Sequence, residues 1–187
     1  MPIAAPFGMA AEPVSSETPP TGGAAAAPVE RDAARLADAL RRRGWRLASA
    51  ESCTGGLIAA ACTALAGSSD WFERGWVTYS NAAKTESLGV PAALIEAHGA
   101  VSEPVACAMA AGALARSGAQ LAVSVTGIAG PGGAVPGKPV GTVWLALAAA
   151  GEAPRAERLQ LDGDRAAVRE QTVRIALRRL IERAGHA

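Results

Sequence analysis

Short apolar segments with the pattern of strands alternate with helical segments from residue 29 onward. Such alternation is typical of an α/β protein with a layered, mostly parallel sheet. The strands are expected at residues 45–51, 75–80, 121–125, 142–149 and 155–161. The linker between the last two is too short for a crossover helix, so these two strands should pair antiparallel. We therefore predict a mixed, mostly parallel sheet of about five strands, with the last strand at an edge.

The helical spacing of apolar residues predicts the elements that cover this sheet. Helices are expected at residues 29–43, 55–66, 91–98 and 103–116, with a short one after residue 80 and a closing one around Leu177. Ser102 is the predicted N-cap of the helix over residues 103–116, its hydroxyl accepting a free backbone amide. His98, at the end of the preceding helix, is best explained as a cap.

Composition excludes several classes of protein. The 187 residues carry a net charge of +1, so the chain lacks the basic surface that nucleic-acid binding needs. No apolar run approaches the roughly 20 residues that span a bilayer. The three cysteines form no Cys-x-x-Cys pattern, and with two histidines they make no recognisable metal set. We expect a soluble, cytoplasmic protein without a metal or a cofactor.

The first 28 residues differ from the rest of the chain. They are rich in Ala, Pro, Gly, Ser and Thr and have no periodic apolar face, which predicts a disordered leader at residues 1–28. The first basic residue is Arg31, so this leader lacks the charged start of a secretory signal. We predict that residues 29–187 form one domain.

Scarce residue types single out one short segment. The chain has only two lysines, Lys84 and Lys138, beside sixteen arginines, one tyrosine, Tyr79, and one asparagine, Asn81. A lysine amine can lose its proton, whereas a guanidinium effectively cannot. The lysines are therefore candidates for work that arginine cannot do, and Lys84 lies close to both Tyr79 and Asn81.

The segment Ala50-Glu51-Ser52-Cys53-Thr54-Gly55-Gly56 lies where a predicted strand runs into a predicted helix. Ligands of open α/β sheets gather at the carboxyl ends of strands. Small residues there let a substrate approach the backbone, and free amides at a helix start can face an anion or an oxyanion. Ser52 is therefore a candidate nucleophile, although the segment is not a Gly-x-Ser-x-Gly elbow. An ordinary Ser/Thr-capped helix start is the alternative interpretation.

Residues 79–84 follow the next predicted strand. A lysine can act as general base for a serine when burial or its neighbours hold the amine neutral. The Ser-x-x-Lys motif is absent, and neither His98 nor the penultimate His186 presents itself as a base. A pairing of Ser52 with Lys84 is therefore favoured over a serine–histidine pair, and a solvated surface lysine is the alternative.

A glycine-rich loop at residues 126–133 follows the predicted strand at 121–125. Its backbone amides could surround a phosphate or a ribose. Residues 132–138 fit Gly-x-x-x-x-Gly-Lys, but Pro139 stands where the motif needs Ser or Thr, and a strand follows instead of a helix. A P-loop is therefore excluded, and a mobile glycine loop without a ligand is the alternative.

Arg165 stands at the predicted start of the closing helix, after Gly163 and Asp164. A cation at that end opposes the helix dipole unless an anion is present, so Arg165 is a candidate anion-binding residue. A surface ion pair with Asp164 is the alternative. The later arginines of this helix are most simply explained as a solvated face; they are Arg169, Arg174, Arg178, Arg179 and Arg183.

Together these motifs resemble the CinA C-terminal domain family. The resemblance also rests on Leu88-Gly89-Val90, on His98-Gly99-Ala100-Val101-Ser102-Glu103 and on Lys138-Pro139-Val140-Gly141-Thr142-Val143, and it covers nearly everything from residue 29. The family includes stand-alone nicotinamide-nucleotide amidases. The resemblance implies a three-layer α/β/α domain, commonly a homodimer, which hydrolyses the carboxamide of nicotinamide mononucleotide to nicotinic acid mononucleotide and ammonia.

The resemblance also assigns roles to single residues. Ser52 matches the nucleophile, Lys84 its base, Tyr79 the tyrosine beside that base, and Thr126 a threonine of the same pocket. We expect Tyr79 to hydrogen-bond the lysine or relay a proton. The expected oxyanion donors are the amides of Cys53, Thr54 and Gly55 and the hydroxyl of Thr54 or Thr126. The residues expected to bind the nucleotide are Asn81, Gly127, Gly130, Gly132, Gly133 and Arg165. Lys138 and residues 134–137 receive no role.

Three other functions stay open. The domain could bind a nucleotide without turnover, because only coordinates show whether Ser52 and Lys84 meet. It could be an interaction module for DNA uptake or recombination, which the balanced charge disfavours. It could also apply serine–lysine chemistry to another small amide.

Overall fold

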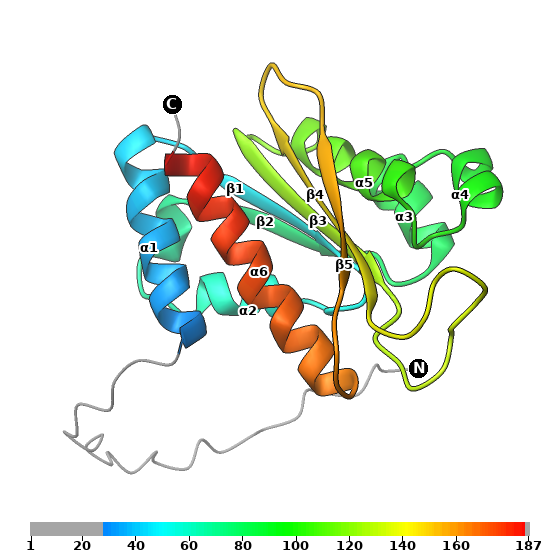
Figure 1. The fold of residues 1–187 in the computed structure, drawn as a ribbon. Helices are drawn as coiled ribbons and strands as arrows, with labels where there is room; N and C mark the ends of the chain where they lie inside the picture. The colour runs from blue at the N-terminus through cyan, green and yellow to red at the C-terminus, as the bar shows by residue number, and fades with distance from the viewer. Residues whose placement is uncertain (1–27, 186–187) are drawn as a thin grey trace, which may run out of the picture.

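A computed structural model of the protein describes residues 28–185 (Figure 1). Its helices are α1 (Pro28–Arg43), α2 (Leu57–Thr63), α3 (Asn81–Leu88), α4 (Ala92–His98), α5 (Glu103–Ala115) and α6 (Arg165–Gly185), with a 3-10 turn, η1, at Ser68–Asp70. Its strands are β1 (Leu47–Glu51), β2 (Phe72–Val77), β3 (Leu121–Gly127), β4 (Thr142–Ala149) and β5 (Arg155–Gln160). The leader predicted at residues 1–28 lies outside the described residues except for Pro28, which begins α1.

Within the described residues, the five strands form one sheet in the order β2-β1-β3-β4-β5. β1 pairs in parallel with β2 and β3, whereas β4 pairs antiparallel with β3 and β5. Four strands therefore point in one direction and β4 runs against them. The prediction of a mixed, mostly parallel sheet with β5 at an edge is confirmed.

Helices cover both faces of this sheet (Figure 1). α1, α2 and α6 pack on one face, and α3, α4 and α5 pack on the other. The result is a three-layer α/β/α sandwich, as the family resemblance implied. The carboxyl ends of β1, β2 and β3 meet at one edge of the sheet, because these strands are parallel.

The two faces of the sheet differ in the size of their side chains. Larger residues such as Leu47, Val123 and Leu145 face α1 and α6. The face toward α5 is made mainly of alanines, namely Ala48, Ala50, Ala122, Ala146 and Ala148. Small side chains let α5 lie close to the sheet, and the Ser124 hydroxyl donates to the Ala106 carbonyl of α5 at 2.6 Å.

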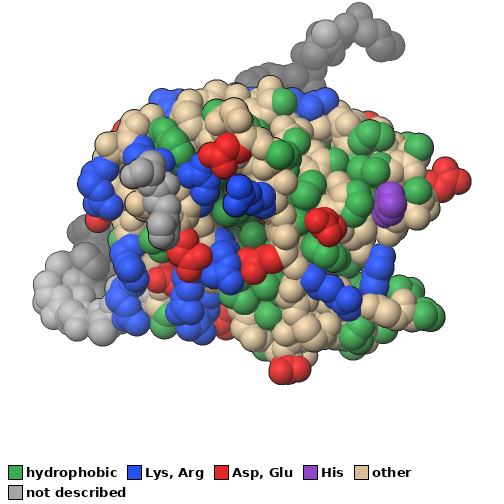
Figure 2. All heavy atoms as spheres, turned by 45° about the horizontal axis from the view of Figure 1, so that its top comes forward, with side chains coloured by type: hydrophobic (Ala, Val, Ile, Leu, Met, Phe, Trp, Pro, Cys, Tyr) green, Lys and Arg blue, Asp and Glu red, His purple; other side chains and the backbone are tan. Residues whose placement is uncertain are grey.

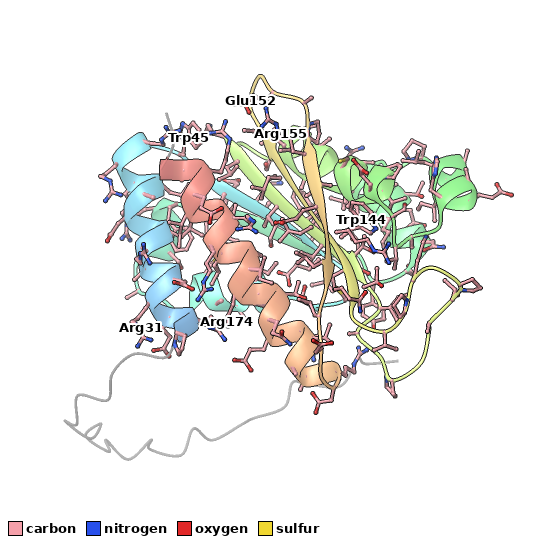
Figure 3. All side chains as sticks on the ribbon, in the orientation of Figure 1. Arg31, Trp45, Trp144, Glu152, Arg155 and Arg174 are labelled. Atoms are coloured by element: carbon pink, nitrogen blue, oxygen red, sulfur yellow. The ribbon has the colours of Figure 1, made fainter. Side chains whose placement is uncertain are left out.

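Helix α5 also packs tightly against the end of α3. A Cβ atom at Gly112 of α5 would collide with the backbone carbonyl of Leu88, the last residue of α3. On its other side α5 meets Trp144 of β4, which packs against the alanines of this interface (Figure 3). The position of α3 is therefore fixed by backbone contact.

Two local predictions were wrong in detail. β2 covers Phe72–Val77 instead of residues 75–80, because Ser80 leaves the strand to cap α3, its hydroxyl accepting from the Ala83 amide at 3.0 Å. Ser102 does stand at the N-cap of α5, but its hydroxyl donates to the Gly99 carbonyl at 2.7 Å and accepts no amide. Pro104 at the start of α5 has no N–H and so needs no acceptor.

The surface shows no concentration of one charge sign on the face drawn in Figure 2, where basic and acidic side chains are interspersed. No helix within residues 28–185 is long and apolar enough to cross a membrane.

Candidate active site

The parallel strands bring most of the predicted site residues to one cavity. Ser52 directly follows β1, Tyr79 follows β2, and Thr126 lies near the end of β3. The cavity, which we call the Ser52 cavity, has a volume of about 220 Å³. Its lining consists of Ser52, Cys53, Tyr79, Asn81, Lys84, Ala100, Val101, Thr126, Gly127, Ala129 and Arg165.

Ser52 and Lys84 meet inside this cavity. The Lys84 amine, in the first turns of α3, lies 3.2 Å from the Ser52 hydroxyl oxygen. The same amine lies 2.8 Å from the Thr78 carbonyl oxygen and 3.4 Å from the Tyr79 carbonyl oxygen. The two residues favoured as a pair from the sequence are thus within hydrogen-bond distance.

Lys84 is buried in an unusual way for a lysine. Its side chain is 1% exposed, and its partners are a hydroxyl and two carbonyls instead of a carboxylate. Burial disfavours the charged ammonium, so the pKa of Lys84 lies below the ordinary value of 10.5. The site therefore lowers the cost of a neutral amine beside Ser52, and the surface-lysine alternative does not hold.

Glu51 organises the turn that carries Ser52, a role that sequence reasoning missed. Its side chain is 1% exposed and accepts from the Thr54 hydroxyl at 2.6 Å. It also accepts from three amides at the start of α2, those of Gly56, Ile58 and Ala59, at 2.9–3.0 Å. A carboxylate at the positive end of a helix satisfies free amides and complements the dipole. The feature of the sequence that could have indicated this role is the position of Glu51, one residue before the candidate nucleophile.

Two of the expected oxyanion donors are engaged elsewhere. The Thr54 hydroxyl donates to Glu51 and is fully buried, so the expectation that it serves the cavity is wrong. The Gly55 amide donates to the Ser52 carbonyl at 3.1 Å, and the Ser52 amide donates to Val125 at 3.0 Å. These contacts shape a sharp turn at residues 52–55. The amides of Cys53 and Thr54 remain as candidate donors, and both also act on the neighbouring Cys53 thiol, whose pKa they lower against the larger effect of burial.

Thr126 does line the cavity, but its hydroxyl has a partner of its own. The hydroxyl donates to the Ala100 carbonyl at 2.9 Å and so connects β3 to the loop before α5. Thr126 therefore supports the cavity wall that contains Ala100 and Val101.

Cys53 lies beside Ser52 and is 5% exposed. Burial raises the pKa of its thiol to about 11, and the nearby Glu51 carboxylate adds to the rise. At neutral pH the thiol stays protonated, so Cys53 is a poor nucleophile and Ser52 remains the candidate.

Tyr79 and Arg165 meet at the mouth of the Ser52 cavity. Arg165 donates to the Tyr79 hydroxyl at 3.0 Å and to the Gly130 carbonyl at 3.1 Å. The phenol therefore does not contact Lys84, which touches Tyr79 only through its backbone carbonyl. The expectation of a phenol–lysine hydrogen bond is wrong, because the exposed Tyr79 ring projects toward α6.

A second cavity adjoins the first at Arg165 and Ala129. This arginine cavity, of about 510 Å³, is lined by residues 129–131 and 163–166 together with Val140 and Arg169. Of the glycines expected to bind the nucleotide, Gly130 lies here, and the exposed Gly132 and Gly133 line neither cavity. Asp164 forms no ion pair with Arg165 in the described part of the chain; its carboxylate accepts from the Ala167 amide at 2.8 Å.

Lys138 has a structural contact outside both cavities. Its amine donates to the His98 carbonyl at 3.0 Å, so the second lysine ties the loop before β4 to the end of α4. Residues 135–138 form a tight antiparallel turn, closed by two backbone hydrogen bonds between Val135 and Lys138.

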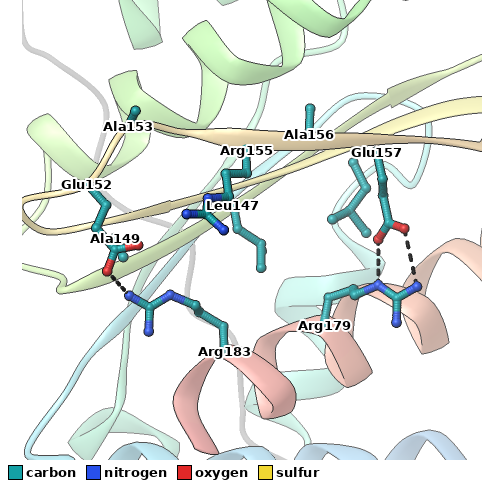
Figure 4. A pocket seen from close by; sticks show the side chains of 10 residues that line it. Leu147, Ala149, Glu152, Ala153, Arg155, Ala156, Glu157, Arg179 and Arg183 are labelled. Atoms are coloured by element: carbon teal, nitrogen blue, oxygen red, sulfur yellow. Dashed lines mark hydrogen bonds and ion pairs between the residues drawn. The ribbon is translucent and has the colours of Figure 1, made fainter. Parts of the chain in front are cut away.

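A third cavity, between β4, β5 and the second half of α6, lies apart from these residues (Figure 4). Its floor is apolar, with Leu145, Leu147 and Ala149. Arg179 forms an ion pair with Glu157 at 2.7 Å on one side, and Arg183 pairs with Glu152 on the other. Two of its three arginines are paired with carboxylates within residues 28–185, the exception being Arg155, and its lining contains no serine and no lysine.

The fold is an α/β/α sandwich, and the carboxyl edge of its parallel strands holds a serine and a buried lysine. These two features together define a class of protein. Comparison with known families agrees: the chain belongs to the CinA C-terminal domain family, whose model matches residues 29–184.

Named relatives fall into two groups by length. A Pseudomonas putida protein named nicotinamide-nucleotide amidohydrolase PncC is 56% identical over 83% of this chain and 96% of its own. A protein of the same name from Enterobacter agglomerans is 53% identical over 77% of this chain and 90% of its own. A CinA-like protein of Mycolicibacterium vanbaalenii is 57% identical, but the match covers only 33% of that longer protein.

Solved structures share the fold. The competence/damage-inducible protein CihA of Agrobacterium tumefaciens superposes with a TM-score of 0.82 at 45% identity, covering 86% of this chain and 98% of that one. A CinA superfamily protein from Klebsiella pneumoniae gives a TM-score of 0.81 at 42% identity, covering 85% and 99%.

Proposed function

We propose that this protein hydrolyses the carboxamide of nicotinamide mononucleotide, giving nicotinic acid mononucleotide and ammonia, with Ser52 as nucleophile and Lys84 as its base. Two relatives matched over most of their length carry the name of this amidohydrolase. The observation that carries the mechanism is the 3.2 Å distance between the Lys84 amine and the Ser52 hydroxyl in a buried site.

The contacts of Lys84 suit a base. A neutral amine has two N–H donors and one lone pair. The carbonyls of Thr78 and Tyr79 can accept the two hydrogens, which turns the lone pair toward the Ser52 hydroxyl. The lowered pKa of Lys84 makes this neutral form accessible.

The reaction then follows in two stages. Ser52 Oγ attacks the carboxamide carbon while its proton passes to the Lys84 amine. The tetrahedral intermediate collapses, and the same proton leaves on the departing ammonia, which yields an acyl-enzyme on Ser52. Water attacks this ester with Lys84 again as base, and the acid is released as Ser52 regains its proton.

The oxyanion of each intermediate needs donors close to Ser52. The amides of Cys53 and Thr54 fill this role in the proposal, because the turn engages the neighbouring amides of Ser52 and Gly55. Glu51 holds the turn from inside through Thr54 and the first amides of α2.

The substrate phosphate lies near Arg165 in this proposal. Arg165 lines both the Ser52 cavity and the arginine cavity, so a nucleotide can place its amide at Ser52 and its phosphate at the guanidinium. Charge-assisted hydrogen bonds from arginine to phosphate are strong and can be bidentate.

Ammonia release from nicotinamide mononucleotide tests the proposal. The wild-type chain should release ammonia with or without a chelator, and Ser52→Ala should lose nearly all turnover while it still binds the nucleotide. Binding without turnover in the wild type would instead support a regulatory domain. Turnover of other amides with this nucleotide left intact would point to a different substrate.

A further inference from the structure

Arg169 differs from those arginines of α6 that pair with carboxylates. It was expected to be part of a solvated face, but its side chain is only partly exposed and its Nε atom is fully enclosed. Within the described residues this Nε–H has no hydrogen-bond partner, which is also true of the Arg174 Nε–H. Arg169 differs from Arg174 in that its Nη2 donates to the Thr54 carbonyl at 2.8 Å and in that it lines the arginine cavity. Because Nε is enclosed, an acceptor in the cavity would have to bind the Nη hydrogens of Arg169 that Thr54 does not use.

Arg169 also faces the arginine cavity. It lies one helical turn after Arg165, and both side chains line this cavity at the amino end of α6. The partners of both guanidinium groups are carbonyls and a phenol, with no carboxylate among them. Asp164 also lines the cavity, with one of its carboxylate oxygens engaged by the Ala167 amide. Two charges without counter-ions and the positive end of a helix dipole thus meet in one hollow.

We propose that Arg169 and Arg165 form a two-guanidinium subsite for a phosphate monoester, and that Arg169 links this subsite to the nucleophile turn. The anion would provide acceptors for donors of Arg169 that the chain leaves unused, while Nη2 keeps its bond to Thr54. The identity of the phosphate as part of the substrate rests on the proposed function. The anion site itself rests on the arginines and their cavity.

The link to catalysis follows from where Thr54 lies. The turn at residues 52–55 is supported from inside by Glu51 and from outside by Arg169. A phosphate that fixes the Arg169 guanidinium also fixes its bond to Thr54, and therefore the placement of Ser52 and of the amides beside it. Arg169 is in this sense a positioning residue, because it acts on Ser52 through the turn.

Binding of inorganic phosphate tests the subsite without any turnover. Calorimetric titration of the full chain, at constant ionic strength with chloride as the background anion, should show phosphate binding to the wild type. Arg169→Gln should weaken it about tenfold or more, because charge-assisted hydrogen bonds are lost. Arg178→Gln is the matched control, since it removes the same charge from the same helix at an ion pair with Asp32.

Two results would contradict the proposed subsite. The first is that the wild-type protein does not bind phosphate, and the second is that Arg169→Gln binds phosphate as well as Arg178→Gln does. If Arg169→Gln fails to fold, Arg169→Lys keeps a cation but not the guanidinium fork, and it should also weaken phosphate binding. Because ammonia release plays no part here, the result stands whether or not the chain acts on nicotinamide mononucleotide.

Kinetics with a divided substrate test the link to the turn. With nicotinamide riboside, which lacks the phosphate, added inorganic phosphate should raise kcat in the wild type and in Arg178→Gln. Arg169→Gln should show no such activation. A purely structural arginine would lower kcat equally with and without phosphate, so equal responses of Arg169→Gln and the control would contradict the positioning role.

Discussion

The two ends of α6 carry the same residue type in two different electrostatic settings. Near its carboxyl end, Arg178, Arg179 and Arg183 pair with Asp32, Glu157 and Glu152, and two of these pairs flank the cavity in Figure 4. Near its amino end, Arg165 and Arg169 donate to carbonyls and to a phenol. A neutralised arginine stabilises the fold, whereas one without a carboxylate keeps its charge available for an anion.

Lys84, like Arg165 and Arg169, is a basic residue without a carboxylate partner among the described residues. Its substitution is expected to have the largest effect on activity. Lys84→Arg keeps the positive charge but removes a group that can lose its proton, so kcat should fall by roughly 10²–10⁴, the usual contribution of a general base. Ammonia release measures the change. Lys138→Arg, at the only other lysine, is the matched control and should leave turnover near the wild-type value. Comparable losses in both variants would reject the special role of Lys84.

The pH dependence of the reaction is a second test of Lys84. The base must be unprotonated, so kcat/KM should rise about tenfold per pH unit below the Lys84 pKa and then level off. Because burial lowers that pKa, the plateau should begin below pH 10.5. A rate that falls as the pH increases over this range would contradict the assignment.

Arg165→Ala tests the amino end of α6, where the two arginines have no carboxylate partner within residues 28–185. Losing charge-assisted hydrogen bonds worth about 1.5–3 kcal/mol should raise KM for nicotinamide mononucleotide by about 10- to 100-fold, with a smaller change in kcat. KM for nicotinamide riboside should hardly change, since it has no phosphate. An equal effect on both substrates would remove Arg165 from the phosphate site.

The smallest effect is expected at the paired end. Arg179→Gln breaks two ion pairs between partly exposed or exposed side chains, with Glu157 at 2.7 Å and with Glu182 at 3.2 Å. The free energy of unfolding should therefore fall by about 1 kcal/mol. Thermal unfolding should then shift by about 2–4 °C, with normal ammonia release. A marked loss of activity would show that the two ends of α6 are not functionally distinct.

The sequence predicted the class of fold, because alternating strands and helices leave few ways to arrange a sheet. It also singled out Ser52 and Lys84, since scarcity and strand ends mark such positions before any contact is known. It could not predict where hydroxyl hydrogens point: Thr54 turns inward to Glu51, and the Tyr79 phenol turns to Arg165. The direction of each of these hydroxyls depends on hydrogen-bonding partners that come close to it only in the folded chain.

The same limit explains Arg169. From the sequence, an arginine near the start of an amphipathic helix resembles any surface cation. The proposed role of Arg169 depends on its having no carboxylate as a hydrogen-bond partner among the described residues. That is a property of the neighbours that α2 and the loop at residues 129–131 place around it.

Gly112, which has no side chain, bears on the position of Lys84 although it does not line the Ser52 cavity. α3 carries Lys84, the proposed general base, and the carbonyl of its last residue, Leu88, lies directly against the α-carbon of Gly112. A methyl group added there would force α3 or α5 to shift, and we expect this shift to alter the distance between the Lys84 amine and the Ser52 hydroxyl. A substitution at this position of α5 is therefore a way to change the activity of the enzyme without altering any group that contacts the substrate.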